Sequence, residues 1–264
     1  MTVNTAGYTV GANQPLNHAR ILYQMLSGTV AGDGSNNILA ANDYTAQRWS
    51  ASPGGLQKWQ LLFAADQSLD SVVIAAHNLA GNRIEIYTAA TIGGGETYRS
   101  GLNPVPDNST IFLMFNTGAG VPVVVRQITL LVYTGTGVQI GIIRAGVALQ
   151  MPIPIYGGHK PITQNRVTEG QHLFSETGQW LGRTAKRLAQ TSSYAWNHVK
   201  SDWYAANFEP FAKTLPLKPF AIAGNPLRMP EDVGWCFTNS DIDVAKMGVL
   251  NHVEFSLNVT GFAG

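Results

Sequence analysis

An apolar run near residue 71 constrains the fold of this chain more than any other feature. Residues 71–76 read SVVIAA, a run with little alternation, which is typical of a strand buried on both faces. It follows an Asn-Asp turn at Asn42 and Asp43 and two tryptophans, Trp49 and Trp59. We therefore expect a β-structure in the first half in which at least one sheet is covered on both sides.

Five further runs in the first half also predict strands. Each is rich in β-branched or aromatic residues and lies between clusters of Gly, Pro, Asn and Asp. They span Trp59 to Phe63, Arg83 to Thr88, Ile111 to Asn116, Val123 to Tyr133 and Val138 to Arg144. Many short strands separated by turns are typical of a β-sandwich. We therefore expect a sandwich over residues 1–155, with residues 1–15 as an extended N-terminal arm.

Two parts of this half show no clear strand pattern. Residues 92–108 contain mainly Gly, Pro and polar residues without a period, which predicts a long surface loop of the kind that often carries recognition. Leu16 to Leu26 is compatible with a short helix and with a strand, and the pattern leaves both open. The loop at residues 92–108 is therefore one candidate region for ligand contacts.

The proline-rich segment 151–161, MPIPIYGGHKP, marks a boundary, because alternating prolines cannot pair as a central strand. Beyond it, Phe174 to Leu181 and Ala185 to Trp196 predict strands around a turn at Gly182 and Arg183. Three more strands are expected at Pro219 to Ala223, Gly234 to Thr238 and His252 to Gly261. Residues 156–264 are thus expected to form a smaller, β-rich α+β domain.

One main helix is predicted in this second domain, over residues 201–215. Ser201 and Asp202 are suitable N-cap residues. Large apolar residues then follow at i, i+4, i+7 and i+11, namely Tyr204, Phe208, Phe211 and Leu215. Pro210 interrupts this pattern and is expected to kink the helix or to split it into two short pieces.

Large apolar residues of both halves form the predicted core. An aromatic residue in a sandwich belongs to the core more often than it stacks on a sugar, so both tryptophans of the 49–59 segment are assigned to the core. The predicted core residues are Trp49, Trp59, Val73, Ile74, Trp196, Tyr204, Phe208, Phe211 and Trp235.

The composition indicates a subunit with neighbours. Charged residues make up only 12% of the 264-residue chain against 45% hydrophobic residues, which leaves few charges to solvate the surface of a free monomer. The net charge is +1 and no Lys/Arg run is present, so we expect no nucleic-acid binding. The longest apolar stretch, Val121 to Met151, is interrupted by polar and charged residues, so we expect no membrane insertion. No signal peptide is expected, and the lone Cys236 fits a reducing cytosol.

No motif in the chain indicates catalysis, a metal or a cofactor. The six histidines lack metal-ligand spacing, and Cys236 lies in the apolar run GWCFT, where a cysteine is usually a small buried hydrophobe. A glycosidase would need paired carboxylates on facing strands, and Asp70 and Glu85 are available but form no recognisable constellation. We therefore predict that the protein is not an enzyme and has no cofactor.

The first half resembles the discoidin, or F5/8 type C, family of galactose-binding-like jelly rolls. The resemblance covers about residues 15–150 and rests on the strand DSVVIAAHNL and on Asn42, Asp43, Thr45, Trp49 and Trp59, although the usual bracketing cysteines are missing. It implies a sandwich whose loops at one end bind carbohydrate, lipid headgroups or protein. The candidate ligand-binding residues are Asn42, Asp43, Arg48, Tyr98 and Arg99.

The second half resembles the C-terminal part of tail proteins of long-tailed bacteriophages, the distal-tail or tail-tip class. The resemblance covers about residues 160–264 and rests on the combination of WYAANFEPF, PFAIAGNP and GWCFT. It implies a ring subunit, hexameric or trimeric, that contacts copies of itself, the tail tube protein and the baseplate hub. Such a subunit is made in the cytoplasm of the bacterial host and resides in the virion.

Two hypotheses for the function follow. The first is a structural tail-tip protein whose outer sandwich can also bind a cell-surface glycan. The second is a soluble carbohydrate-binding module or adhesin without a ring role, in which residues 160–264 only support the loops near Asp43, Arg48 and Arg99. The two hypotheses differ in the number of subunits expected in solution.

Overall fold

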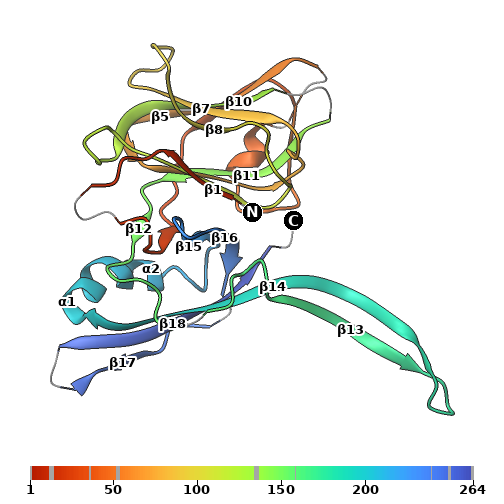
Figure 1. Cartoon of the computed structure of the whole chain (residues 1–264). Helices are drawn as coiled ribbons and strands as arrows, with labels where there is room; N and C mark the ends of the chain where they lie inside the picture. Colours follow the sequence, from red (N-terminus) through yellow and green to blue (C-terminus); the bar gives the residue numbers. More distant parts are fainter. Residues whose placement is uncertain are drawn as a thin grey trace.

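The computed structural model describes residues 2–11, 15–35, 37–51, 54–133, 137–157, 159–238, 240–248 and 251–262. They form three β-sheets, one main helix and a short 3₁₀ helix, so the fold is mainly β, as predicted (Figure 1). Two five-stranded sheets form a β-sandwich, and the third sheet packs below it together with the helix (Figure 1). The predicted combination of a sandwich with a β-rich α+β part is confirmed.

The first sheet of the sandwich lies in the middle of the molecule. Its strands, in spatial order, are β1 (Thr2–Gly7), β9 (Ile111–Phe115), β6 (Ser71–His77), β11 (Gln139–Gly146) and β4 (Trp49–Ser50). Every residue of β6 is buried, because both faces of this sheet are covered. Val72 and Ile74 contribute to the core of the sandwich, whereas Val73 and Ala75 belong to a second cluster shared with the third sheet. The expected burial of this strand on both faces is therefore confirmed.

The second sheet covers the other side of the sandwich core. Its strands, in spatial order, are β3 (Thr29–Gly32), β5 (Leu56–Leu69), β10 (Val123–Tyr133), β7 (Arg83–Ala89) and β8 (Thr97–Leu102). In the part of β5 that pairs with β10, residues alternate, so that Trp59, Leu61 and Phe63 are buried while their neighbours are partly exposed. This alternation is typical of a sheet with one face in water.

One expectation for the first half is wrong. Residues 92–108 are not one long loop, because β8 lies within them and pairs with β7. Within the expected extended arm, residues 2–7 form β1, which pairs in parallel with β9. The segment left open between helix and strand contains the short strand β2 (Arg20–Leu22).

The third sheet has eight strands and draws on both halves of the chain. Seven lie in the order β12 (Leu149–Gln150), β2, β15 (Phe220–Asn225), β16 (Met229–Phe237), β18 (His252–Gly261), β14 (Trp180–Lys200) and β13 (Arg166–Phe174). The eighth, β17 (Val244–Lys246), pairs with β18. Because β2 and β12 belong to this sheet, the sheet pairing does not follow the boundary expected at residue 155. After β1, the chain first contributes β2 to the third sheet, then forms the rest of the sandwich, and returns to the third sheet at β12.

The predicted helix begins as expected and ends slightly early. It consists of α1 (Ser201–Trp203), a π-helical turn (Tyr204–Phe208) and α2 (Glu209–Ala212). Pro210 lies in the first turn of α2, and the helical segments follow one another without a gap from residue 201 to 212, so it does not split the helix into separate pieces. The expected side-chain cap is wrong, since Lys200 occupies the N-cap position without a side-chain hydrogen bond.

The helix covers an aromatic cluster on the third sheet. Phe208 is fully buried and its ring lies 4.5 Å from that of Phe255, 5.2 Å from Phe211 and 6.3 Å from Trp196, measured between centroids. Tyr204 is partly buried at the edge of this cluster. The other eight predicted core residues are all buried, namely Trp49, Trp59, Val73, Ile74, Trp196, Phe208, Phe211 and Trp235.

The β13–β14 hairpin projects from the body of the molecule as a long arm (Figure 1). Its turn lies at residues 175–179, where the Ser175 amide donates to the Gln179 carbonyl oxygen at 2.8 Å. The expected strand over Phe174 to Leu181 with a turn at Gly182 and Arg183 is therefore wrong. Gly178 takes a φ of +81° in the turn, which glycine adopts without steric cost, whereas Gly182 lies inside β14 with a φ of +140°.

His77, at the end of β6, makes the stability of the sandwich depend on pH. Its Nε2–H donates to the Ser109 carbonyl oxygen at 2.8 Å, and its Nδ1 accepts from the Leu79 amide at 3.2 Å, an arrangement that requires the neutral ring. Burial of the ring lowers its pKa from 6.5 to about 4. The unfolded chain therefore binds more protons than the folded chain between these two pH values.

We expect the folded state to lose about 3 kcal/mol of stability as the pH falls from 6.5 to 4, because the pKa of His77 is depressed on folding. Urea unfolding midpoints at several pH values in this window measure the effect. In His77→Gln, which cannot titrate, the loss over the same window should be clearly smaller. An identical pH dependence in both proteins would contradict the role of His77.

Candidate binding surfaces

The five predicted ligand-binding residues do not form one site. Asn42, Asp43 and Arg48 lie between the 3₁₀ helix η1 (Asn37–Ala41) and β4, at the sandwich edge formed by β3 and β4. Tyr98 and Arg99 lie on β8, at the opposite edge, where β1 and β8 are neighbours. The order of the strands thus places the two groups on different sides of the sandwich.

Asn42 and Asp43 of the first group are engaged in local structure. The Arg144 guanidinium donates to Asp43 Oδ1 at 2.7 Å, which ties the turn to β11. Asn42 accepts from the Tyr44 amide at 2.5 Å and donates to the Leu39 carbonyl oxygen. These contacts fix the turn in the way an Asx turn usually does.

The second group forms an exposed polar and aromatic edge. Arg99 Nε donates to Thr88 Oγ1 at 2.7 Å, and partial burial lowers the pKa of its guanidinium. The Tyr98 ring packs edge-on against Tyr87 with centroids 5.6 Å apart, and half of its surface stays exposed. Both residues therefore stabilise the β7–β8 pair in addition to any role at the surface.

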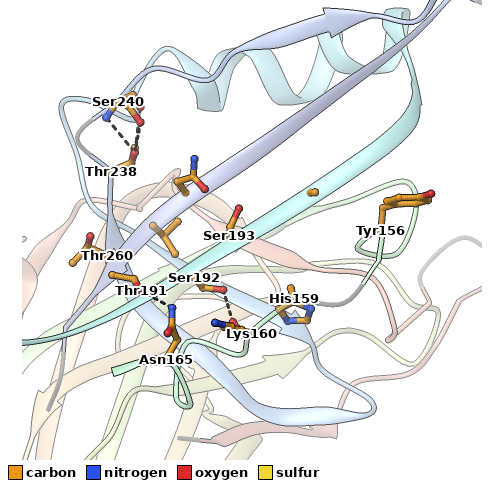
Figure 2. Close-up of a pocket in the computed structure, with 13 residues that line it drawn as sticks. Tyr156, His159, Lys160, Asn165, Thr191, Ser192, Ser193, Thr238, Ser240 and Thr260 are labelled. Atoms are coloured by element: carbon orange, nitrogen blue, oxygen red, sulfur yellow. Dashed lines mark hydrogen bonds between the residues drawn. The ribbon is translucent and has the colours of Figure 1, made fainter. Parts of the chain in front are cut away.

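A pocket of about 620 Å³ opens on the third sheet, away from all of these residues (Figure 2). Its wall contains Thr191 and Ser193 of β14 and Asn258 and Thr260 of β18. These four are cross-strand partners, since Thr191 is paired with Thr260 and Ser193 with Asn258. Because side chains at i and i+2 point to the same side of a strand, they form one polar patch, here called the β14–β18 patch.

Two connecting segments complete the pocket. Residues from the segment before β13, among them Tyr156, Lys160 and Asn165, line one side, and Thr238 and Ser240 line another (Figure 2). Asn165 Nδ2 donates to Thr191 Oγ1 at 2.8 Å, which attaches the segment to the β14–β18 patch. The lining is therefore built largely from hydroxyl and amide groups.

A buried carboxylate holds one wall of this pocket in place. Asp232 of β16 is fully buried and accepts from the Ile162 amide at 2.9 Å and from the Tyr194 hydroxyl at 3.1 Å, and it contacts His159 Nε2 at 2.8 Å. Burial and the nearby carboxylate raise the pKa of the Tyr194 phenol well above its usual value. No local sequence pattern predicts this network, because its members come from three separate segments.

The projecting arm is the second surface of note. It is defined here as β13 and residues 175–190, and β13 is the terminal strand of its sheet. Among the arm residues whose burial the structure describes, five large apolar side chains are exposed, namely Val167, Leu173, Phe174, Trp180 and Leu181. Trp180 and Leu181 keep 63% and 66% of their surface exposed, which is unusual for residues of this size.

The described part of the chain contains no group of three or more His, Cys, Asp or Glu residues that could hold a metal ion. Cys236 is fully buried, and burial raises the pKa of its thiol well above the usual value. Asp70 and Glu85 each accept hydrogen bonds within the protein, Asp70 from Ala148 and Ser71 and Glu85 from three side chains of the second sheet. Among the described residues, no helix is long and apolar enough to cross a membrane.

No protein-family model and no curated protein matches this chain. Solved structures do match about half of it. A chitosan-binding module of a chitosanase/glucanase from Paenibacillus sp. IK-5 is 13% identical, with a TM-score of 0.39, and the match covers 46% of this chain and 96% of that module. The module CBM32-1 of a family 31 glycoside hydrolase from Clostridium perfringens is 12% identical, with a TM-score of 0.39 and coverages of 47% and 98%.

A pectin-binding carbohydrate-binding module is 19% identical, with a TM-score of 0.35, and the match covers 46% of this chain and 90% of the module. About half of the chain is similar in fold to these modules. These similarities concern the fold alone and assign no ligand to this chain.

Proposed function

We propose that the protein is a structural subunit that assembles with copies of itself through the arm, as expected for a ring subunit of a phage tail tip. The observation that carries this proposal is the row of exposed apolar side chains on a projecting hairpin. Other parts of the tail, the tube protein and the baseplate hub, are the expected neighbours of such a ring. The resemblance of residues 160–264 to tail-tip proteins supports the same assignment.

The physical argument rests on the arm. A single exposed apolar side chain is common on protein surfaces, but several together mark an interaction surface. The arm also presents β13 as an edge strand, whose free backbone groups can pair with another chain. An arm that buries Phe174, Trp180 and Leu181 against a neighbour removes these groups from water and lowers the free energy of the assembly.

We expect the double variant Phe174→Ser/Trp180→Ser to dissociate into monomers at concentrations where the parent protein is assembled. Two aromatic anchors at an interface contribute about 1 to 2 kcal/mol each, so the dissociation constant should rise about 100-fold. Sedimentation velocity over a concentration series measures this shift. Leu217→Ser is the matched control, since Leu217 is 80% exposed and lies after the helix, outside the arm. Unchanged assembly in the double variant, or equal loss in the control, would contradict the proposal.

A carbohydrate-binding module or adhesin without a ring role is the second candidate. It is supported by the resemblance of residues 15–150 to discoidin domains, a family whose loops bind ligands. The names of the matched modules suggest chitosan and pectin fragments as first ligands to test. Binding by a strictly monomeric protein, lost in Arg48→Ala or in Arg99→Ala, would favour this candidate. A glycan array without signal would count against it.

A further inference from the structure

We propose that the pocket between β14, β18 and the 156–165 segment binds a saccharide that carries a carboxylate. The pocket lies on the third sheet, outside the sandwich, so the proposal depends neither on self-assembly nor on ligand binding by the sandwich loops. Its volume of about 620 Å³ is within the range of small-ligand sites and accommodates a short oligosaccharide.

The first argument is the hydrogen-bonding capacity of the lining. Ser193 and Asn258 are exposed cross-strand partners, and no side-chain hydrogen bond to another described residue is recorded for either of them. A hydroxyl both donates and accepts, and a side-chain amide presents two donors and one acceptor oxygen. Groups with this mixed capacity match the hydroxyls of a sugar ring, which also donate and accept. Thr260, next to them on the β14–β18 patch, adds a third such group.

The second argument is an exposed aromatic ring. Tyr156 keeps 60% of its surface exposed and lines the pocket. Its backbone is held in place, because its amide donates to the Ala195 carbonyl oxygen of β14 at 2.8 Å. An aromatic face next to hydrogen-bonding groups suits a sugar, whose ring has apolar C–H faces and polar edges. Figure 2 shows this ring at one side of the pocket and Thr238 and Ser240 at another.

The third argument concerns charge. Among the lining residues that the structure describes, none carries a carboxylate, and Lys160 alone has a permanent positive charge. Lys160 is exposed and forms no ion pair with the residues that the structure describes, so its ammonium group is free to meet an anion. Hydrogen bonds between an ammonium and a carboxylate are about twice as strong as neutral ones. An acidic sugar is therefore favoured over its neutral counterpart.

The fourth argument is that the wall is rigid before a ligand arrives. Ser192 Oγ donates to the Lys160 carbonyl oxygen at 2.7 Å, and Asp232 holds His159 and the Ile162 amide on either side of it. The backbone of Lys160 is thus held by its own carbonyl oxygen and by the hydrogen bonds of the neighbouring residues His159 and Ile162. A wall that is already ordered loses less conformational entropy on binding.

Isothermal titration of the full-length protein with trigalacturonate and with its fully methyl-esterified form tests the proposal. The two sugars have the same ring hydroxyls, and the ester lacks the negative charges and carries a methyl group on each carboxyl instead. We expect saturable binding of trigalacturonate about tenfold tighter than that of the ester. Lys160→Gln should abolish the difference between the two sugars, and Asn258→Ala should weaken both to a similar extent. Lys218→Gln is the control for charge, since Lys218 is exposed after the helix and does not line the pocket.

Absence of saturable binding, or equal affinity for the acid and the ester, would overturn the proposal. So would binding that survives both pocket variants and is lost in Arg48→Ala, because that result places the sugar on the sandwich. If Phe174→Ser/Trp180→Ser loses self-assembly but binds the sugar as the parent protein does, the pocket binds sugar independently of assembly through the arm. Circular dichroism of Lys160→Gln and Asn258→Ala, which alter exposed side chains, should show intact folds.

Discussion

Replacement of Phe208 by alanine should destabilise the protein by about 3 to 5 kcal/mol. Phe208 is fully buried between the helix and the third sheet, where its ring contacts those of Trp196, Phe211 and Phe255. Truncation to alanine removes these contacts and leaves a cavity that the surrounding rings cannot fill without leaving their rotamers. For a chain of this size the melting temperature should fall by about 10 °C.

Thermal unfolding followed by circular dichroism measures this effect, and guanidinium unfolding gives the free energy. The control is Leu217→Ala, which removes a side chain that is 80% exposed in the turn after the same helix. Its melting temperature should change by less than 2 °C or so. Equal melting temperatures for Phe208→Ala and the parent protein would show that the helix does not pack on the sheet as described.

Replacement of Asp232 by alanine should cost about 3 to 5 kcal/mol as well. The carboxylate is fully buried and serves three partners, the Ile162 amide, the Tyr194 hydroxyl and His159 Nε2. Removal of the acceptor leaves these polar groups unsatisfied in the core, and a buried donor without a partner carries its full desolvation cost. We also expect the 159–162 segment to detach from the sheet, which would open one wall of the pocket.

Asp232→Asn separates the loss of the hydrogen-bond acceptor from the loss of the negative charge. The amide oxygen can still accept from Ile162 and Tyr194, so this variant should lose clearly less stability than Asp232→Ala. Urea unfolding of both variants gives the two free energies, and hydrogen exchange of the Ile162 amide reports on the attached segment. Equal losses in both variants, or faster exchange in neither, would contradict the assigned hydrogen bonds.

Several elements of this fold could be predicted because local sequence determines them. The bounds of β10 and β18 match the predicted ranges, since both are long runs of strand-forming residues. The all-buried strand β6 was recognisable from its lack of alternation, which reflects a sheet covered on both faces. The spacing of Phe208 and Phe211 likewise identified the buried side of the helix.

Other elements depend on partners far away in the sequence. Strand β8 reads TYRSGL. This polar, glycine-containing sequence does not predict a strand by itself, and the strand is defined by its pairing with β7. Strands β2 and β12 have three and two residues, too few for a periodic pattern, and their place in the third sheet is set by pairing with β15 and with each other. The third sheet therefore takes strands from both sides of the expected boundary at residue 155.

The candidate sites were less predictable than the fold. Type and loop position suggested Asn42, Asp43, Arg48, Tyr98 and Arg99, but the strand order separates them onto opposite edges of the sandwich. The polar pocket was not predicted, because the pairing of Ser193 with Asn258 joins residues 65 positions apart, by the difference of their numbers. The pattern predicts two strands here but places their turn at Gly182 and Arg183, whereas Gly182 lies within β14 and the turn lies at residues 175–179.

The mass of the purified full-length protein in solution tests the central claim most directly. Light scattering across a concentration series gives the number of 28.4 kDa subunits per particle. The account predicts a closed assembly, three or six subunits, which dissociates when Phe174 and Trp180 are replaced by serine. A strict monomer at every concentration would contradict the proposed assembly through the arm.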